Sequence, residues 1–319
     1  MISTRFLRAH RYAALTPGPR LIVTGAVHGN ETAGTRAIER VRAEIESGAI
    51  GILRGTLTLV PVCNPLAYAK GRREGDRNLN RRLQPCALPI DHEDHVANLL
   101  CPWLAEHDAL LDLHSFRSPG WPFVMRGPAD NAGPLEPFAH AADEARLAAH
   151  LGPNRIVDGW MAVYAAGVER RRARAPAPDA VSEDAAYGVG TTEYMRSVGG
   201  WGLTLECGQH DDPAAPDVAY TAIRQAIALL GLAGLPLAPP ARPFECLTLV
   251  EVVDRHDDGD AFVRPWSSFD PLAAGEPIAR RADGSELRAP RAGYIVFPDV
   301  GARPGHEWFY LAQPSTRPI

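Results

Sequence analysis

The sequence has little cysteine, no long apolar run and no excess of basic residues. Its five cysteines are scattered, odd in number and without a CxxC pair, which favours free thiols over a disulfide framework. No apolar run approaches the ~20 residues that span a bilayer, and residues 1–20 lack the sustained apolar stretch of a signal peptide. The formal net charge of −5 excludes a global basic field for nucleic acid or an anionic membrane. We therefore expect a cytoplasmic protein that binds neither.

The chain is long enough to bury a sizeable core without disulfides. Its 319 residues favour one large domain plus a smaller one. The shares of hydrophobic residues, 45%, and of charged residues, 22%, are ordinary for a globular protein. The sequence leaves open whether copies of the chain form a homo-oligomer.

Strand and helix patterns alternate over most of the chain. β-branched apolar runs predict strands, and apolar residues at helical spacing predict helices. The expected strands are residues 20–27, 55–63, 109–113 and 201–207, and the expected helices are residues 35–48, 91–106, 134–151 and 219–232. The basic and then Pro/Ala-rich residues 168–182 predict an exposed loop. This alternation predicts an α/β fold with a mixed, mostly parallel sheet flanked by helices.

The pattern changes after about residue 244, where turn residues separate short runs of β-forming residues. Residues 234–243, rich in proline, predict a linker. We therefore expect residues 1–240 to form the α/β domain and residues 241–319 to form a small β-rich, barrel-like domain.

Three candidate metal ligands follow two of the predicted strands. His28 and Glu31 form an H-x-x-E pair at a helix start, where residues three apart can face one centre. His114 follows the strand at residues 109–113 and would emerge at the same sheet edge. Two His and one Glu are a known ligand set for catalytic zinc. An isolated H-x-x-E is common without metal, but the two features together predict one zinc ion per chain.

A rival H-x-x-H pair lies at His92 and His95, in a predicted helix among acidic residues. Such a pair is typical of a solvated helix start. We favour that interpretation over a second metal site.

Glu206 lies near the end of the strand predicted at residues 201–207, where an acid is out of place in a purely structural strand. A carboxylate at such a position is either paired or chemically active. Glu206 is the candidate general base, which would take a proton from water and return it to a leaving amine. The alternative is a buried salt bridge.

Residues 70–83, KGRREGDRNLNRRL, are rich in arginine. A charge run is usually a solvated face, and we accept that interpretation for most of these arginines. Asn80 and Arg81 differ, because an amide beside a planar guanidinium suits bidentate capture of a carboxylate. Arg73 could polarise a scissile carbonyl and stabilise its oxyanion.

The ordered motifs resemble a known family. HGNE at residues 28–31, NP at 64–65, DRNLNR at 76–81, DLH at 112–114 and ECG at 206–208 are similar, in this order, to the succinylglutamate desuccinylase/aspartoacylase family. That family belongs to the zinc carboxypeptidase-like superfamily. The resemblance covers about residues 20–235, and the β-rich tail is similar to the family's C-terminal domain. Each motif is weak alone, whereas the ordered set is specific.

The resemblance implies a role for each matched residue. His28, Glu31 and His114 correspond to zinc ligands, and Glu206 to the catalytic glutamate. Arg73 corresponds to the arginine that assists the carbonyl. The pair Asn80 and Arg81 corresponds to the residues that bind a substrate carboxylate.

Three further positions match the family less directly. Arg196 matches, by its spacing from Glu206, an arginine that holds a substrate carboxylate in aspartoacylases. Tyr310, or its neighbour Phe309, matches a substrate-contacting tyrosine. Asn78 departs from the family pattern, in which an acid is frequent at this position.

The resemblance implies a zinc-dependent hydrolase that removes the acyl group from a small N-acyl amino acid. Two alternatives remain open. One is a zinc carboxypeptidase that trims short peptides, which a cleft narrowed by the small C-terminal domain disfavours. The other is a non-catalytic zinc-binding or ligand-binding protein, which the presence of Glu206 beside all three ligands disfavours.

Overall fold

The computed structural model describes residues 6–173, 184–240 and 242–319. In these residues, eleven strands form one large sheet in the order β1-β3-β2-β4-β7-β5-β6-β8-β14-β13-β10, and a small sheet has the order β12-β11-β9. The strands are β1 (His10–Ala13), β2 (Arg20–Gly25), β3 (Thr56–Val60), β4 (Ala109–Phe116), β5 (Phe123–Met125), β6 (Arg155–Asp158), β7 (Trp201–Gln209), β8 (Glu245–Asp254), β9 (Ala261–Phe262), β10 (Pro271–Leu272), β11 (Pro277–Arg280), β12 (Glu286–Arg288), β13 (Gly293–Val296) and β14 (Glu307–Pro314).

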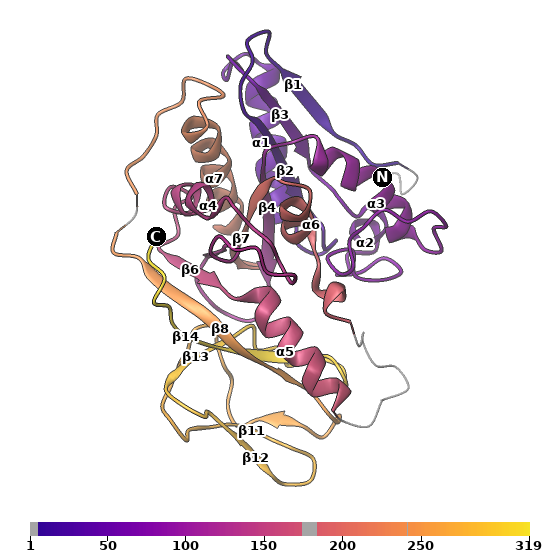
Figure 1. Ribbon diagram of the computed structural model, residues 1–319, viewed down its shortest axis with the longest axis vertical. Coiled ribbons are helices and arrows are strands. Elements are labelled where there is room, and N and C mark those ends of the chain that lie inside the picture. Colours follow the sequence, from indigo (N-terminus) through magenta and orange to yellow (C-terminus); the bar gives the residue numbers. More distant parts are fainter. Residues whose placement is uncertain (1–5, 174–183, 241) are drawn as a thin grey trace.

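Helices flank the large sheet (Figure 1). They are α1 (Ala33–Glu46), α2 (Pro65–Lys70), α3 (His92–Ala105), α4 (Ala141–Ala148), α5 (Trp160–Arg172), α6 (Thr191–Ser197) and α7 (Ala215–Leu229), with a 3-10 helix at Ala185–Gly188. No helix of the described ranges is long and apolar enough to cross a bilayer.

The centre of the sheet is parallel, as the alternating pattern predicts. Strands β3, β2, β4 and β7 run parallel, and β5 is antiparallel to β7. Central strands of a covered parallel sheet are apolar on both faces, and all eight residues of β4 are buried. The predicted fold class, a mixed and mostly parallel sheet flanked by helices with a small β-rich part, is confirmed.

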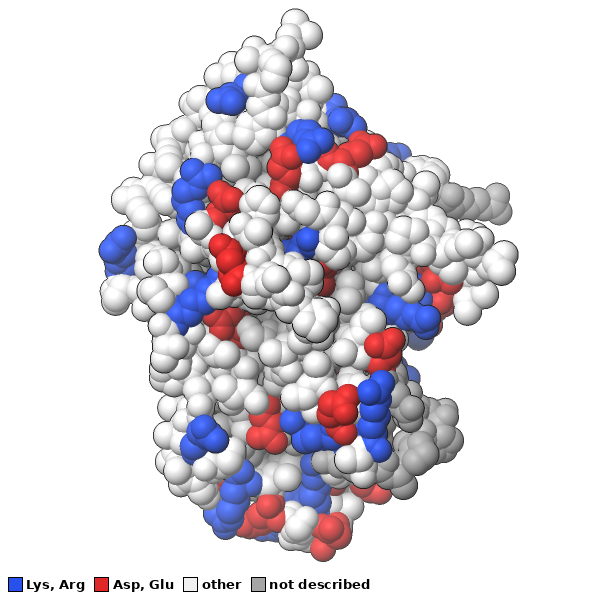
Figure 2. Space-filling model, viewed as in Figure 1, with Lys and Arg blue, Asp and Glu red and all other residues white. Residues whose placement is uncertain are grey.

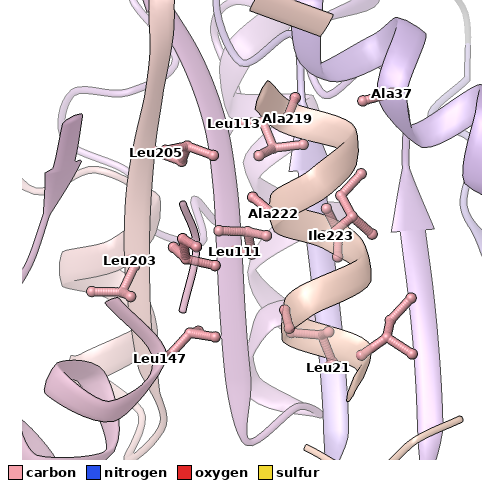
Figure 3. Packing of buried hydrophobic residues seen from close by; sticks show 14 of the residues in the cluster. Leu21, Ala37, Leu111, Leu113, Leu147, Leu203, Leu205, Ala219, Ala222 and Ile223 are labelled. Carbon is pink, nitrogen blue, oxygen red and sulfur yellow. The ribbon is translucent and has the colours of Figure 1, made fainter. Parts of the chain in front are cut away.

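Two apolar clusters hold the helices on opposite faces of the sheet. Helices α1, α4 and α7 pack on one face, where Leu111 and Leu203 meet Ala222 and Ile223 of α7 (Figure 3). Alanine on α7 lets this helix approach the strands closely. Helices α3 and α6 pack on the other face through a second cluster that includes Leu100 and Met195.

In the described part of the chain, every regular element after residue 244 is a strand, as predicted. Strand β8 runs parallel to β6, and β14 pairs antiparallel with β8, so both extend the large sheet. Strands β9, β11 and β12 form the separate small antiparallel sheet. The proposed division of the chain at residue 240 stays a prediction.

Two predicted elements differ from the observed ones. The helix expected at residues 134–151 begins only at Ala141. Pro134 and Pro137 prevent the residues before Ala141 from forming a helix. In this segment an isolated β-bridge pairs Asn131 with Phe138. The loop expected at residues 168–182 starts inside α5, which runs to Arg172. Its last-turn arginines suit the negative end of the helix dipole. Residues 174–183 lie outside the described residues.

The surface carries no large single-sign field on the face drawn in Figure 2, where basic and acidic side chains are interspersed. This agrees with the small net charge of −5.

Candidate metal and substrate site

A pocket opens beyond the carboxyl ends of the central parallel strands. This is the edge at which open α/β sheets bind ligands. Its walls include nearly all of the residues singled out from the sequence: His28, Glu31, Arg73, Asn80, Arg81, His114, Arg196, Glu206 and Tyr310. Residues that are distant in the chain therefore meet at one cavity.

The chain turn after β2 positions His28 and Glu31. Gly29 lies so close to α2 that a Cβ there would stand 2.0 Å from the backbone carbon of Ala67. Ala26, directly after the strand, adopts a positive φ of 47°, a conformation that costs energy in a residue other than glycine. The turn is therefore a constrained structure.

His28, Glu31 and His114 form what we call the His-Glu-His centre. Each is buried, and each offers one ligand atom within 4.8 Å of the other two. Nδ1 of His28 lies 2.9 Å from Oε1 of Glu31, and Nδ1 of His114 lies 2.9 Å from Oε2. Among the residues that the structure describes, this is the only group of at least three His, Cys, Asp or Glu side chains that could hold a metal. The pair His92 and His95 is not part of one.

The outer ring nitrogens of both histidines have other partners. Nε2 of His28 lies 3.0 Å from Oδ1 of Asn78, and Nε2 of His114 lies 2.7 Å from Oδ2 of Asp112. Asp112 also accepts hydrogen bonds from the hydroxyls of Thr24 and Thr191. Such partners fix the orientation of a ligating imidazole. Both rings therefore turn Nδ1 toward Glu31.

The electrostatics of the centre follow from burial and close charges. Burial, reinforced by the nearby Arg73 cation, lowers the pKa of His28 to about 4, so its imidazole is neutral. Burial opposes a charge on His114, yet Asp112 and Glu31 raise the pKa of its imidazole well above the usual value. The pKa of Glu31 is held well below its usual value by the two histidines, against the effect of burial.

Glu206 sits on β7 opposite His114 of β4, its register partner. It is buried, and its Oε2 has no hydrogen-bond partner. Burial is the main cause that raises the pKa of Glu206 to about 8, and Glu31 adds to the rise. The alternative interpretation, a buried salt bridge, finds no support, since no ion pair of Glu206 occurs among the described residues.

Arg73 reaches the centre from the arginine-rich loop. Its Nη1 donates to Oε1 of Glu31 at 2.9 Å, and its side chain is 43% exposed. The loop is held by buried Glu93, which accepts from the backbone N–H of Gly75, Asp76 and Arg77. A solvent-reaching cation at the rim of the centre can meet a ligand oxygen without a large desolvation cost.

Asn80 and Arg81 are ordered by different contacts. Asn80 accepts from the backbone N–H of Thr191, and Gly190 permits this because a Cβ there would lie 2.2 Å from Asn80 Oδ1. The guanidinium of Arg81 is buried over the ring of Trp160, 4.9 Å from the ring centroid. Its Nη1 donates to the carbonyl of Asn80, and its Nη2 lies 3.7 Å from Glu307.

Tyr310 and Phe309 face opposite sides of β14. Tyr310 lines the pocket with its ring 5.6 Å from that of Trp160. Phe309 packs in the apolar cluster of the small sheet. Of the two, Tyr310 is therefore the one placed to touch a ligand.

Arg196 lies at the centre of what we call the Arg196 cluster, with Glu136, Glu144 and Glu193. Its Nε donates to Glu144 at 2.8 Å, and its Nη1 donates to Glu136 and Glu193 at 2.8 and 3.2 Å. Its Nη2 donates to the carbonyl of Gly202 at 2.8 Å. The expected role of Arg196, binding a substrate carboxylate, stays a prediction that these contacts do not favour.

Sequence reasoning gave no role to Asp112 and Trp160, and noted Asn78 only as a departure from the family pattern. The sequence could have placed Asp112 at the site, because residues two apart in a strand point to the same face and Asp112 is two residues before His114. Trp160 gave no such signal, since it stands in a helix far from the motifs.

Comparison with known proteins agrees with this geometry. Residues 17–121 match the model of the succinylglutamate desuccinylase/aspartoacylase catalytic domain. The predicted family resemblance is confirmed. No curated protein gives a match in sequence.

Solved structures resemble the whole chain. The product-bound ectoine utilization protein EutE (DoeB) from Ruegeria pomeroyi gives a TM-score of 0.71 at 19% identity, over 96% of this chain and 88% of that chain. A succinylglutamate desuccinylase/aspartoacylase from Rhodobacter sphaeroides gives 0.71 at 16% identity, over 97% and 90%. An aspartoacylase family protein from Mesorhizobium loti gives 0.66 at 18% identity, over 98% and 90%. At these identities the likeness establishes the fold.

Proposed function

We propose that the protein is a zinc-dependent hydrolase that cleaves the amide bond of a small N-acyl amino acid. The family match and the named neighbours support a desuccinylase/aspartoacylase-like activity. One observation carries the proposal: beside three buried side chains whose ligand atoms face one another, Glu206 keeps a buried oxygen without a partner. Such an oxygen is costly in a structural role and useful in a catalytic one.

The side chains of the His-Glu-His centre fit one zinc ion. Two imidazoles and a carboxylate suit zinc and leave a position open. Nδ1 of His28 is buried with no hydrogen-bond partner although it lies 2.9 Å from Glu31. A ring nitrogen and a carboxylate oxygen held this close suit a shared cation. Zinc held here would polarise an acyl carbonyl and acidify a water.

The chain's own residues supply the remaining chemistry. Glu206 acts in its ionised form, which a cation bound by the neighbouring ligands would favour: it takes the proton of the attacking water and then delivers it to the departing amine nitrogen. Arg73 donates N–H groups to the oxygen on which negative charge develops. Arg81, with Asn80 beside it, binds the substrate carboxylate and so orients the amide, and Tyr310, which packs against Trp160 as Arg81 does, contacts the substrate beside them.

Residues on both sides of the predicted boundary at residue 240 line the pocket. Glu307 and Tyr310 of β14 line it together with residues of the central sheet. We propose that residues 241–319 narrow the entrance, which favours small substrates over peptides. The free cysteines support a cytoplasmic location.

A hydrolysis screen tests the proposal. Zinc-loaded protein is incubated with acetyl and succinyl derivatives of acidic, neutral and basic amino acids, and released amine is measured. Glu206→Gln should lose about 10²–10⁴-fold in turnover and keep its zinc, while Glu286→Gln, an exposed glutamate far from the pocket, serves as the control. Full turnover by zinc-containing Glu206→Gln would refute the assignment, and activity of verified metal-free protein would remove zinc from the mechanism.

The two alternatives make different predictions in the same assay. A carboxypeptidase would cleave a short unblocked peptide faster than any N-acyl amino acid. A non-catalytic ligand-binding protein would bind amino acids tightly and release no amine across the whole panel.

A further inference from the structure

The pocket is lined by several arginines, and their existing partners decide which of them can receive a substrate anion. The guanidinium groups belong to Arg73, Arg81, Arg117, Arg126 and Arg196. A guanidinium has five N–H donors and binds a carboxylate best when a pair of them is free. The number of anions that the pocket accepts therefore depends on how many of these donors are already used.

Arg196 has almost no donor left. Four contacts to Glu136, Glu144, Glu193 and the Gly202 carbonyl occupy its nitrogens. Its side chain is only 3% exposed. An anion reaching Arg196 would have to displace one of these buried acids.

The N–H donors of Arg126 are likewise occupied, whereas the side chain of Arg117 is exposed to solvent. Arg126 donates to Asp158 through Nε and Nη2, and to the carbonyls of Arg317 and Pro318. Arg117 pairs with Asp299 at 2.9 Å and is 54% exposed, so water screens its charge. Arg73 is engaged with Glu31 at the metal centre.

Arg81 is the remaining buried guanidinium of the pocket. Its one hydrogen bond, among the described residues, goes to the carbonyl of Asn80, and Glu307 is 3.7 Å away. Trp160 and Tyr164 stack near its plane, which leaves the N–H edge free for a ligand. Arg81 can therefore receive one carboxylate.

The wall around Arg196 repels a second carboxylate. Three glutamates surround one arginine there, so the wall carries more negative than positive groups. Glu193 itself lines the pocket. A negative group of the substrate placed here would lie beside these acids, and the cation of this wall, Arg196, already has its partners.

We propose that the substrate presents a single carboxylate, bound by Arg81, and that a second carboxylate, on the amino-acid side chain or on the acyl group, is selected against by the Arg196 cluster. The substrate is then the N-acyl derivative of a neutral or basic amino acid with an uncharged acyl group. This inference rests on the proposed function and narrows its substrate class.

Matched substrate pairs test the inference. N-acetylglutamine and N-acetylglutamate have nearly the same shape and differ in one charge, and N-butyrylglutamine and N-succinylglutamine differ likewise in the acyl group. The monoanionic member of each pair should have the higher kcat/KM by at least about tenfold, because like charges side by side are strongly unfavourable in a desolvated site. A preference for the dianionic member of either pair would overturn the inference while the proposed function stands.

Binding measurements on the zinc-loaded protein distinguish a failure of the inference from a failure of the proposed function. Calorimetric titration with the same pairs should give tighter binding of the monoanions, whether or not turnover occurs. Absence of turnover with this preference would refute the proposed function and support the inference. Equal binding within each pair would refute the inference alone.

Variants of the cluster sharpen the test. Glu136→Ala leaves Nη1 of Arg196 with Glu193 as its remaining acceptor and removes one negative group, so the kcat/KM ratio of N-acetylglutamate to N-acetylglutamine should rise about threefold or more. Glu169→Ala, an exposed glutamate on α5, is the control and should leave the ratio unchanged. Glu193→Gln, which removes the acid that lines the pocket, should raise the same ratio, and a ratio that stays unchanged or falls in both cluster variants would overturn the inference.

Discussion

The His-Glu-His centre and the Arg196 cluster are both buried groups of charged side chains beside the same pocket, yet their hydrogen bonding differs. In the Arg196 cluster, the arginine nitrogens meet carboxylates and a carbonyl, and Glu144 also accepts from the backbone N–H of Gly127 and Gly202. In the centre, Nδ1 of His28 and Oε2 of the adjacent Glu206 lack partners. Buried polar groups are normally satisfied. The difference indicates that the cluster supports the fold, whereas the centre keeps polar atoms that a ligand could use.

Removing the arginine of the cluster should have the largest effect on stability. Arg196→Met leaves three buried glutamates without their cation and should lower the free energy of unfolding by about 3–5 kcal/mol. Chemical denaturation measures this. Arg117→Met removes one member of the exposed pair with Asp299 and should change the free energy of unfolding by less than about 1 kcal/mol. Equal effects of the two substitutions would show that the cluster is not structural.

Replacing Arg81, which makes one hydrogen bond among the described residues, should instead affect substrate binding. Arg81→Met should lower kcat/KM by about 100-fold, mainly through KM, since a bidentate partner of the substrate carboxylate is lost. Steady-state kinetics measure this, and zinc content should not change. The neighbouring Arg82 is exposed, so Arg82→Met is the matched control. Unchanged KM in Arg81→Met would remove this residue from the substrate site.

The outer partner of a metal ligand should have a smaller effect. Asn78→Ala removes the acceptor of His28 Nε2 and should weaken zinc binding by about tenfold. Competition with a coloured chelator measures this affinity directly. Asn154→Ala, at an exposed position outside the pocket, should bind zinc as the unchanged protein does. Equal affinities in both variants would mean that Asn78 does not orient His28.

The smallest expected effect is on how the stability of the protein depends on pH. Burial raises the pKa of Glu136 to about 7 from an ordinary value of 4.5. The folded state then holds a proton that the unfolded state releases, so this residue's contribution to stability decreases as pH rises through that window. Thermal unfolding of Glu136→Gln, which lacks this titration, should show stability rising relative to the unchanged protein between about pH 5 and about pH 8. Glu169→Gln, at an exposed site, should give no such slope.

The elements predicted from sequence are those with a long or regular apolar pattern. The strands now numbered β2, β3, β4 and β7, and helices α1, α3 and α7, match the expected ranges within a few residues. Strands β1, β5 and β6, of three or four residues each, were missed because so short a run carries no clear period. The start of α4 was misplaced because prolines were included in the helical pattern.

The site divides in the same way. Residues near the carboxyl ends of strands, such as His28 and His114, are placed by the sheet topology, so sequence reasoning could bring them together. The partners of Arg196 come from separate loops and helices, and spacing along the chain says nothing about which carboxylates will meet a guanidinium. The family resemblance, matched here by spacing from Glu206, thus suggested a ligand-binding role for an arginine whose nitrogens are occupied.

The pairing of β14 with β8 has a consequence for biosynthesis. Strand β8 leaves the ribosome well before β14, and until then its outer edge has no neighbour and is open to other chains. Because β14 also brings Glu307 and Tyr310, a nascent chain can assemble the His-Glu-His centre while one wall of the pocket is still missing. The β8 edge therefore stays unprotected until the chain has been made as far as β14.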